Sequence, residues 1–229
     1  MYRDTITDIF FDLDHTLWDF DKNSSLAFAR VFKAHKVDVA LNDFLNIYEP
    51  INFDYWKLFR EDKVSKMTLR RGRLIDTFQR FGIVFSTEKI DLLAEAYIDE
   101  LPGDNHLLPG SMELLGYLTK KYRLHIITNG FDELQRLKLQ KSGINDFFLT
   151  VTSSEEAGVK KPNPIIFELA VRKANTKPSQ SLMIGDTYEA DVLGAASFGM
   201  KTIFYNYRSE EIPNHFPKVD SLLEIKSYL

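Results

Sequence analysis

Acidic and polar side chains follow the short apolar runs of this 229-residue chain, at the points where buried strands would end. In chain order they are Asp12, Asp14, Thr128, Asn129, the neighbouring pair Lys160 and Lys161, Asp186 and Asp191. Ligands of open α/β sheets bind beyond the carboxyl ends of the strands. We therefore expect these side chains to converge on one crevice.

Three carboxylates at one edge of a sheet repel each other and raise each other's pKa values unless a positive charge lies among them. A divalent cation supplies that charge. Oxygen ligands without a nearby histidine or cysteine suit Mg²⁺, which fills its remaining positions with water and phosphate oxygens. The sequence therefore predicts a magnesium site with room for a phosphoryl group.

The other residue types in this set match the needs of phosphoryl transfer. Thr128 can donate a hydroxyl hydrogen bond, Asn129 can donate an amide hydrogen bond, and a lysine adds a full positive charge to the phosphate oxygens. Asp12 can attack phosphorus and form an aspartyl phosphate. Asp14 lies two residues on, hence on the same side of an extended backbone. It can protonate the leaving oxygen and later take a proton from water.

The apolar runs themselves are typical of buried strands. They are Ile6–Phe11, Leu124–Ile127, Phe147–Val151, Leu182–Ile184 and Thr202–Tyr205. Helix-period segments follow at Met112–Tyr122, Glu133–Ser142, Pro164–Asn175 and Ala190–Phe198. Because strands and helices alternate, the sequence predicts an α/β fold with a doubly wound, parallel, Rossmann-like sheet.

Residues 21–102 interrupt this alternation. They contain no convincing strand and carry apolar residues at helical spacing, for example Leu92, Leu93 and Ala96. We expect a smaller helical cap domain at 21–102 and a catalytic α/β core domain formed by 1–20 and 103–229. The segment between Leu41 and Met67 has no readable motif, and we expect loops of the cap there.

Composition excludes several other classes of protein. The chain is 44% hydrophobic with a net charge of −4 and scattered basic residues, which favours neither nucleic acid nor a membrane as a partner. It has no cysteine, so disulfides and thiolate chemistry are excluded. The first residues contain acids and no apolar run long enough for a signal or a membrane span. We expect a cytoplasmic protein.

Four motifs, FDLDHT, ITNG, KKP and GDTYEAD, occur in this order, with the helical insertion after the first. Over essentially the whole chain the pattern resembles the haloacid dehalogenase-like (HAD) hydrolase superfamily. The resemblance implies that Asp12 is the nucleophile and Asp14 the acid and base, with a backbone carbonyl that also ligates Mg²⁺. It implies further that Asp186 is the second carboxylate ligand of the metal. Asp191 would lie next to the ligands without binding the metal itself. Thr128, Asn129 and Lys161 would bind phosphate. Lys161 is chosen over Lys160 because the family lysine stands directly before proline.

The residues within and around these motifs are similar to those of bacterial pyrimidine 5′-nucleotidases. This resemblance implies pyrimidine (deoxy)nucleoside monophosphates as substrates. Asp14 argues for phosphate over halide, since the dehalogenases of the superfamily lack that aspartate. Two alternatives stay open: a sugar-phosphate or phosphoglycolate phosphatase or mutase of the same superfamily, and an inactive binding module. In every active case the partner is a small phosphorylated molecule.

Overall fold

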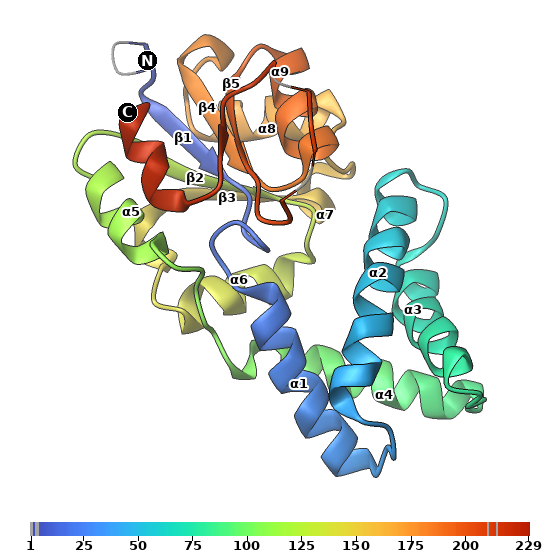
Figure 1. The fold of residues 1–229 in the computed structure, drawn as a ribbon. Helices are drawn as coiled ribbons and strands as arrows, with labels where there is room; N and C mark the ends of the chain where they lie inside the picture. The colour runs from blue at the N-terminus through green and yellow to red at the C-terminus, as the bar shows by residue number, and fades with distance from the viewer. Residues whose placement is uncertain (1, 3–4, 210, 214) are drawn as a thin grey trace. The chain divides into compact units, whose positions relative to one another are not determined.

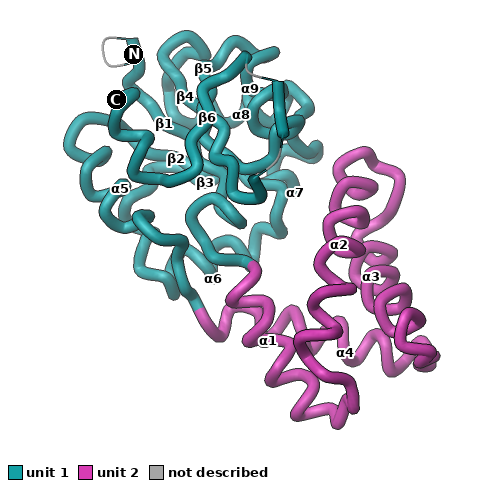
Figure 2. The backbone as a smooth tube through the Cα atoms, viewed as in Figure 1, with its two compact units in different colours: residues 1–20, 105–229 teal, residues 21–104 magenta. Residues whose placement is uncertain are grey.

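The computed structural model describes residues 2, 5–209, 211–213 and 215–229 (Figure 1). The chain forms two compact units, one made of residues 1–20 and 105–229 and the other of residues 21–104 (Figure 2). The second unit is thus an insertion in the first. It leaves the first unit after Phe20, where helix α1 begins, and the chain returns at Asn105.

The first unit is built on a six-stranded sheet with the order β3-β2-β1-β4-β5-β6. The strands are β1 (Asp8–Phe11), β2 (Arg123–Thr128), β3 (Phe148–Ser153), β4 (Ser181–Gly185), β5 (Lys201–Tyr205) and β6 (Lys218–Val219). All five neighbouring pairs are parallel. The predicted α/β class with a parallel sheet is confirmed, and only the two-residue β6 among these strands lacks a counterpart in the prediction.

Helices connect the strands of this sheet (Figure 1). They include α5 (Ser111–Leu118), α6 (Asp132–Lys141), α7 (Ser154–Ala157), α8 (Pro164–Lys173), a π-helical segment η4 (Tyr188–Leu193) and α9 (Gly194–Phe198). The start of α8 is encoded locally, because Asn163 Oδ1 accepts a hydrogen bond from Ile165 N at 3.0 Å and Pro164 takes the first helical position. The helix expected at Ala190–Phe198 is a π-helical turn followed by α9.

The core of the first unit lies around the central strand β1. Ile9, Phe10 and Phe11 are fully buried, as expected for a parallel strand that is covered on both faces. Phe10 belongs to a cluster with Ile166 and Phe167 of α8. This packing covers one face of β1, and the full burial of Ile9 and Phe11 shows that the other face is covered as well. The residues that follow Phe11 therefore start from a strand that is fixed in place.

The amino end of β1 carries a buried polar cluster centred on Asp8. Its carboxylate accepts hydrogen bonds from Arg123 at 2.8 Å, Thr7 at 2.6 Å and Thr176 at 2.7 Å, and it lies 3.0 Å from His125 Nε2. Burial alone would raise the pKa of Asp8, but Arg123 and the other partners hold it below its ordinary value. Burial lowers the pKa of His125, although Asp8 opposes this effect.

This cluster predicts a loss of stability in mild acid. Because Asp8 has a lowered pKa in the folded protein, its contribution is present above about pH 4 and disappears as the pH falls through the folded value. The pKa of His125 is also lowered, so below about pH 6.5 the unfolded chain takes up a proton that the folded protein resists. We expect Asp8→Asn to lower the free energy of unfolding by about 3 kcal/mol at neutral pH and to flatten its fall below about pH 4, where Asp8 titrates in the unfolded chain.

Urea unfolding from neutral pH down to about pH 3 measures both effects, the His125 effect below about pH 6.5 and the Asp8 effect below about pH 4. Glu113→Gln is the control, because Glu113 forms an exposed ion pair with Lys226 and its loss should change stability by less than about 1 kcal/mol. An unchanged pH dependence in Asp8→Asn would contradict the assignment.

The second unit is helical and packs around aromatic side chains. Its helices are α1 (Phe20–His35), α2 (Leu41–Arg60), α3 (Lys66–Arg80) and α4 (Thr87–Glu100). The expected loops between Leu41 and Met67 are wrong, because α2 occupies most of that segment and continues through Pro50. Three of its four buried side chains, Phe44, Tyr48 and Asn52, recur every four residues, and the polar Asn52 hides this helical period in the sequence. Within the described part of the chain, no helix is both long and apolar enough to cross a membrane.

Candidate active site

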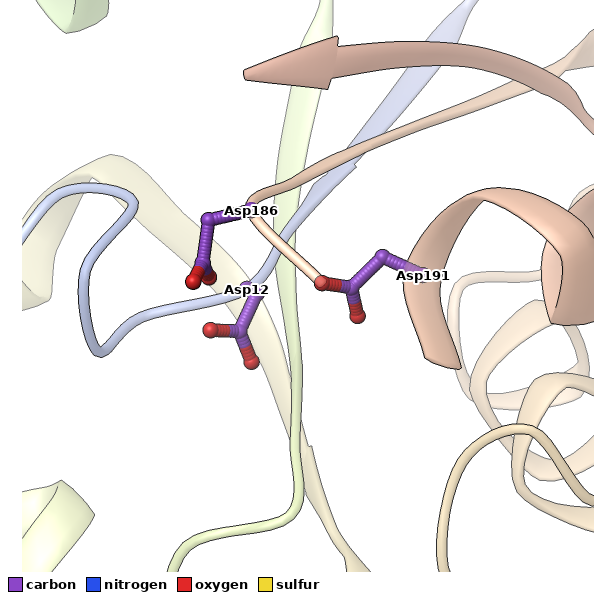
Figure 3. A group of neighbouring side chains, drawn as sticks. All are labelled: Asp12, Asp186 and Asp191. Atoms are coloured by element: carbon purple, nitrogen blue, oxygen red, sulfur yellow. The ribbon is translucent and has the colours of Figure 1, made fainter. Parts of the chain in front are cut away.

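The loop after β1 places Asp12 at the carboxyl edge of the sheet. Asp12 N donates to the carbonyl of Ile184 in β4 at 2.9 Å, which extends the ladder by one residue and fixes where the side chain leaves the sheet. Asp186 follows the adjacent strand β4, and Asp191 lies on η4. Figure 3 shows the side chains of these three aspartates converging from the three segments.

Lys161 is buried between two of these carboxylates. Its Nζ lies 2.6 Å from Asp12 Oδ1 and 2.7 Å from Asp191 Oδ1, and it donates to the carbonyl of Ile127 at 2.7 Å. Only 2% of Lys161 is exposed. Burial alone would lower its pKa, but Asp12 and Asp191 raise it, so the ammonium stays charged. The neighbouring Lys160 is only partly buried, so Lys161 is the lysine of the site.

Asp12, Asp186 and Asp191 form an oxygen-only group that could hold a metal ion. One carboxylate oxygen from each lies within 4.8 Å of the others, and all three residues are buried. Burial raises the pKa of Asp12 to about 7 against the opposing effect of Lys161. Burial, with repulsion by Asp12 and Asp191, also raises the pKa of Asp186. One lysine thus leaves negative charge uncompensated, and a hard divalent cation fits this donor set.

The position of Asp191 depends on a close approach of η4 to the end of β4. Asp191 Oδ2 accepts a hydrogen bond from Thr187 N at 3.0 Å. A Cβ on Gly185 would lie 2.2 Å from Asp191 Oδ2, so no side chain fits at Gly185. Asp186 is held differently, because its Oδ1 accepts from Thr16 Oγ1 at 3.1 Å. Asp191 therefore faces Lys161, whereas Asp186 is held from the loop after β1.

Thr128 and Asn129 lie at the end of β2, beside Lys161. The Asn129 side chain holds the backbone of Lys161 from both sides, since Nδ2 donates to Lys161 O at 3.0 Å and Oδ1 accepts from Lys161 N at 2.8 Å. Thr128 Oγ1 accepts from Gly130 N at 3.0 Å and from Gln135 Nε2 at 2.7 Å. Its own hydroxyl hydrogen can still be donated. Asn129 thus fixes the loop of Lys161.

The Asp14 carboxylate lies apart from the three-aspartate group and faces helix α6. Its Oδ1 accepts from Lys138 Nζ at 2.6 Å, and its Oδ2 accepts from Gln135 Nε2 at 3.0 Å. About a quarter of the Asp14 side chain is exposed, 23%, against 11% for Asp12. Asp14 is therefore the more accessible of the two aspartates of the first motif.

Sequence reasoning missed Gln135 and Lys138. Both are buried on α6 together with Leu134 and Leu139. The signal in the sequence is a glutamine and a lysine that share the helical period of the buried leucines, in a helix that directly follows the turn at Asn129 and Gly130. A polar residue on the apolar face of a helix needs a partner, and here that partner is Asp14.

Comparison with known proteins gives a consistent result. A family model described as haloacid dehalogenase-like hydrolase matches residues 8–199. The chain is 34% identical to the pyrimidine 5′-nucleotidase YjjG of Escherichia coli, with 96% of each chain covered. It is 31% identical to the glyceraldehyde 3-phosphate phosphatase of Methanothermobacter thermautotrophicus, with 96% of this chain and 98% of the relative covered. The magnesium-bound crystal structure of the HAD-hydrolase YfnB from Bacillus subtilis superposes with a TM-score of 0.88 at 26% identity, covering 97% of this chain and 98% of that one.

Proposed function

The chain belongs to the haloacid dehalogenase-like hydrolase family, and from this we propose that it is a Mg²⁺-dependent phosphomonoester hydrolase acting through an aspartyl phosphate. One observation carries the proposal. Asp12 lies beside the buried ammonium of Lys161 and within a group of carboxylates suited to a cation, while a second aspartate, Asp14, is held separately nearby. The arrangement separates a nucleophile from a group that can exchange protons.

The residues present fit Mg²⁺. Asp12 and Asp186 would hold the ion with the backbone carbonyl of Asp14. Asp191 would stay outside the ligands, because its Oδ1 is paired with Lys161 and its Oδ2 accepts from Thr187 N. When bound, Mg²⁺ would neutralise charge on the phosphoryl oxygens. The magnesium-bound form of the relative YfnB supports this choice of ion.

The proposed reaction has two steps. A carboxylate oxygen of Asp12 attacks phosphorus, the bond between phosphorus and the ester oxygen breaks, and Asp14 gives its proton to the leaving alkoxide. Water then attacks phosphorus, Asp14 takes a proton from that water, and the bond to Asp12 breaks to release inorganic phosphate. Thr128 and Lys161 donate to the phosphoryl oxygens, and Asn129 contributes by holding the Lys161 backbone.

We propose pyrimidine nucleoside 5′-monophosphates as the substrate class. The relative YjjG is a pyrimidine 5′-nucleotidase, and its similarity to this chain extends over nearly the whole length of both. A sugar-phosphate phosphatase is the second candidate. It is favoured by the similarity to a glyceraldehyde 3-phosphate phosphatase over nearly the same length. Both candidates require the same chemistry at Asp12 and differ only in the leaving group.

Phosphate release from a panel of esters tests metal and substrate together. We expect EDTA to lower the rate of phosphate release by about 100-fold or more and added Mg²⁺ to restore it. The reason is that the ion stabilises the charge of the transition state by several kcal/mol. Among thymidine, deoxyuridine and purine monophosphates, sugar phosphates and phosphoglycolate, the pyrimidine nucleotides should give the highest kcat/KM. A preference for glyceraldehyde 3-phosphate would keep the mechanism and replace the substrate. Full activity in EDTA would contradict the metal.

A further inference from the structure

Helix α6 contributes two buried polar side chains that contact both oxygens of Asp14. We propose that Gln135 and Lys138 are positioning residues that hold the Asp14 carboxylate where it can exchange protons with the leaving group and with water. The inference rests on the proposed function. The two residues are three positions apart on one helix, so they lie on the same face.

Lys138 is held in place from several sides. Its Nζ lies 2.6 Å from Asp14 Oδ1, and only 3% of its side chain is exposed. The ammonium also lies 4.3 Å from the ring centroid of Trp18 and 5.3 Å from that of Phe20, within the range of cation–π contacts. Burying an ammonium is costly unless it is paired. The lysine therefore has one defined place, with Asp14 as its carboxylate partner.

Gln135 joins Asp14 to the phosphate side of the site. Its Nε2 donates to Asp14 Oδ2 at 3.0 Å and to Thr128 Oγ1 at 2.7 Å. The amide orientation follows from Asp14, because an ionised carboxylate only accepts hydrogen bonds. A Cβ on Gly130 would lie 2.3 Å from Gln135 Nε2, so glycine at this position lets the side chain reach across the turn. Gln135 thus fixes the distance between Asp14 and Thr128.

The site therefore has two lysines with separate tasks. Lys161 contacts Asp12 and Asp191, and Lys138 contacts Asp14. Without the contacts from α6, the partly exposed Asp14 carboxylate could rotate towards solvent. A displacement of about 1 Å in a reacting group can cost on the order of 100-fold in rate. Loss of Lys138 should accordingly slow the steps in which Asp14 moves a proton and spare the attack by Asp12.

Two esters with different leaving groups separate these steps. The kcat/KM value covers only the steps up to departure of the leaving group, in which a nucleoside alkoxide needs a proton and p-nitrophenolate does not. We expect Lys138→Met to lower kcat/KM for the preferred nucleotide by about 100-fold and for p-nitrophenyl phosphate by less than about threefold. Lys138→Arg, which keeps the charge, should lose less than Lys138→Met. Gln135→Leu should lower kcat/KM for both esters, because Gln135 also contacts Thr128, but by about 10-fold more for the nucleotide than for p-nitrophenyl phosphate.

Lys141→Met is the matched control, because Lys141 is exposed at the end of the same helix and should leave both values unchanged. Thermal unfolding identifies any variant that fails to fold. If Lys138→Met unfolds, Lys138→Arg and Gln135→Leu carry the comparison.

A double-mutant cycle with Asp14→Asn gives the decisive second measurement. In that background Lys138→Met should cost less than about twofold on the nucleotide, because the group that it positions is gone. Equal losses on the two esters, or the same loss in both backgrounds, would overturn the inference while the enzyme remains a phosphatase. A wild-type protein without activity on either ester would instead overturn the proposed function.

Discussion

Replacing Asp12 with asparagine is expected to reduce phosphate release to the background level, a loss on the order of a million-fold in kcat. The amide lacks the anionic oxygen that would attack phosphorus. Asp14 cannot take over this role, because its carboxylate faces α6 and not the group formed by Asp12, Asp186 and Asp191. The fold should survive. Asp191 still pairs with the Lys161 ammonium at 2.7 Å, and the amide of asparagine fills the same space as the carboxyl.

Two measurements check this expectation. Steady-state phosphate release gives the loss in kcat, and mass spectrometry after rapid mixing with substrate should detect a phosphoryl adduct on the wild-type protein and none on Asp12→Asn. Asp146→Asn is the control, because Asp146 is an exposed acid of the same unit and its loss should change neither result. Retained turnover in Asp12→Asn would refute Asp12 as the nucleophile.

Replacing Asp14 with asparagine should separate the two chemical steps. With p-nitrophenyl phosphate the first step needs no proton, so we expect one equivalent of p-nitrophenolate per enzyme to appear rapidly. The second step lacks its base, and steady-state turnover should fall by about 1,000-fold. The aspartyl phosphate should therefore accumulate on Asp12.

Stopped-flow absorbance measures the burst, and the mass of the trapped protein measures the adduct. The double variant Asp12→Asn with Asp14→Asn is the control and should give neither a burst nor an adduct. Steady-state turnover of Asp14→Asn at the wild-type rate would exclude Asp14 as acid and base. A fall in turnover with neither a burst nor an adduct would show that Asp14 is needed before the leaving group departs, even when that group needs no proton.

The sheet was predictable from the sequence because a strand buried on both faces is a continuous apolar run, and such a run is local in the chain. Ile9–Phe11 and Leu182–Ile184 carry this pattern, and both lie in central strands of the sheet. The two-residue β6 was not predictable, because its existence depends on pairing with Phe204 and Tyr205 of β5 and on nothing periodic in its own residues. The four-residue α7 carries local cap signals, Ser153 before it and Gly158 after it, but it is too short to show a helical period.

The helical insertion was recognisable as helical, but α2 within it was not. Its buried face mixes Phe44 and Tyr48 with the polar Asn52, whose Oδ1 accepts a hydrogen bond from Arg73 Nη1 of α3 at 2.8 Å. A polar residue in such a place is stable only because another helix supplies its partner. That partner is distant in the sequence.

The sequence by itself determined which residue types stand after each strand, and hence the family and the chemistry to expect from Asp12, Asp14 and Asp186. Their roles stay predictions. Only the tertiary structure decided which groups contact each other. Lys161 forms ion pairs with Asp12 and Asp191, Asn129 hydrogen-bonds the Lys161 backbone, and Asp14 accepts hydrogen bonds from α6. The physical reason is that a hydrogen bond joins atoms within about 3 Å. The partners here are 30 to 149 positions apart in the chain, so folding alone brings them together.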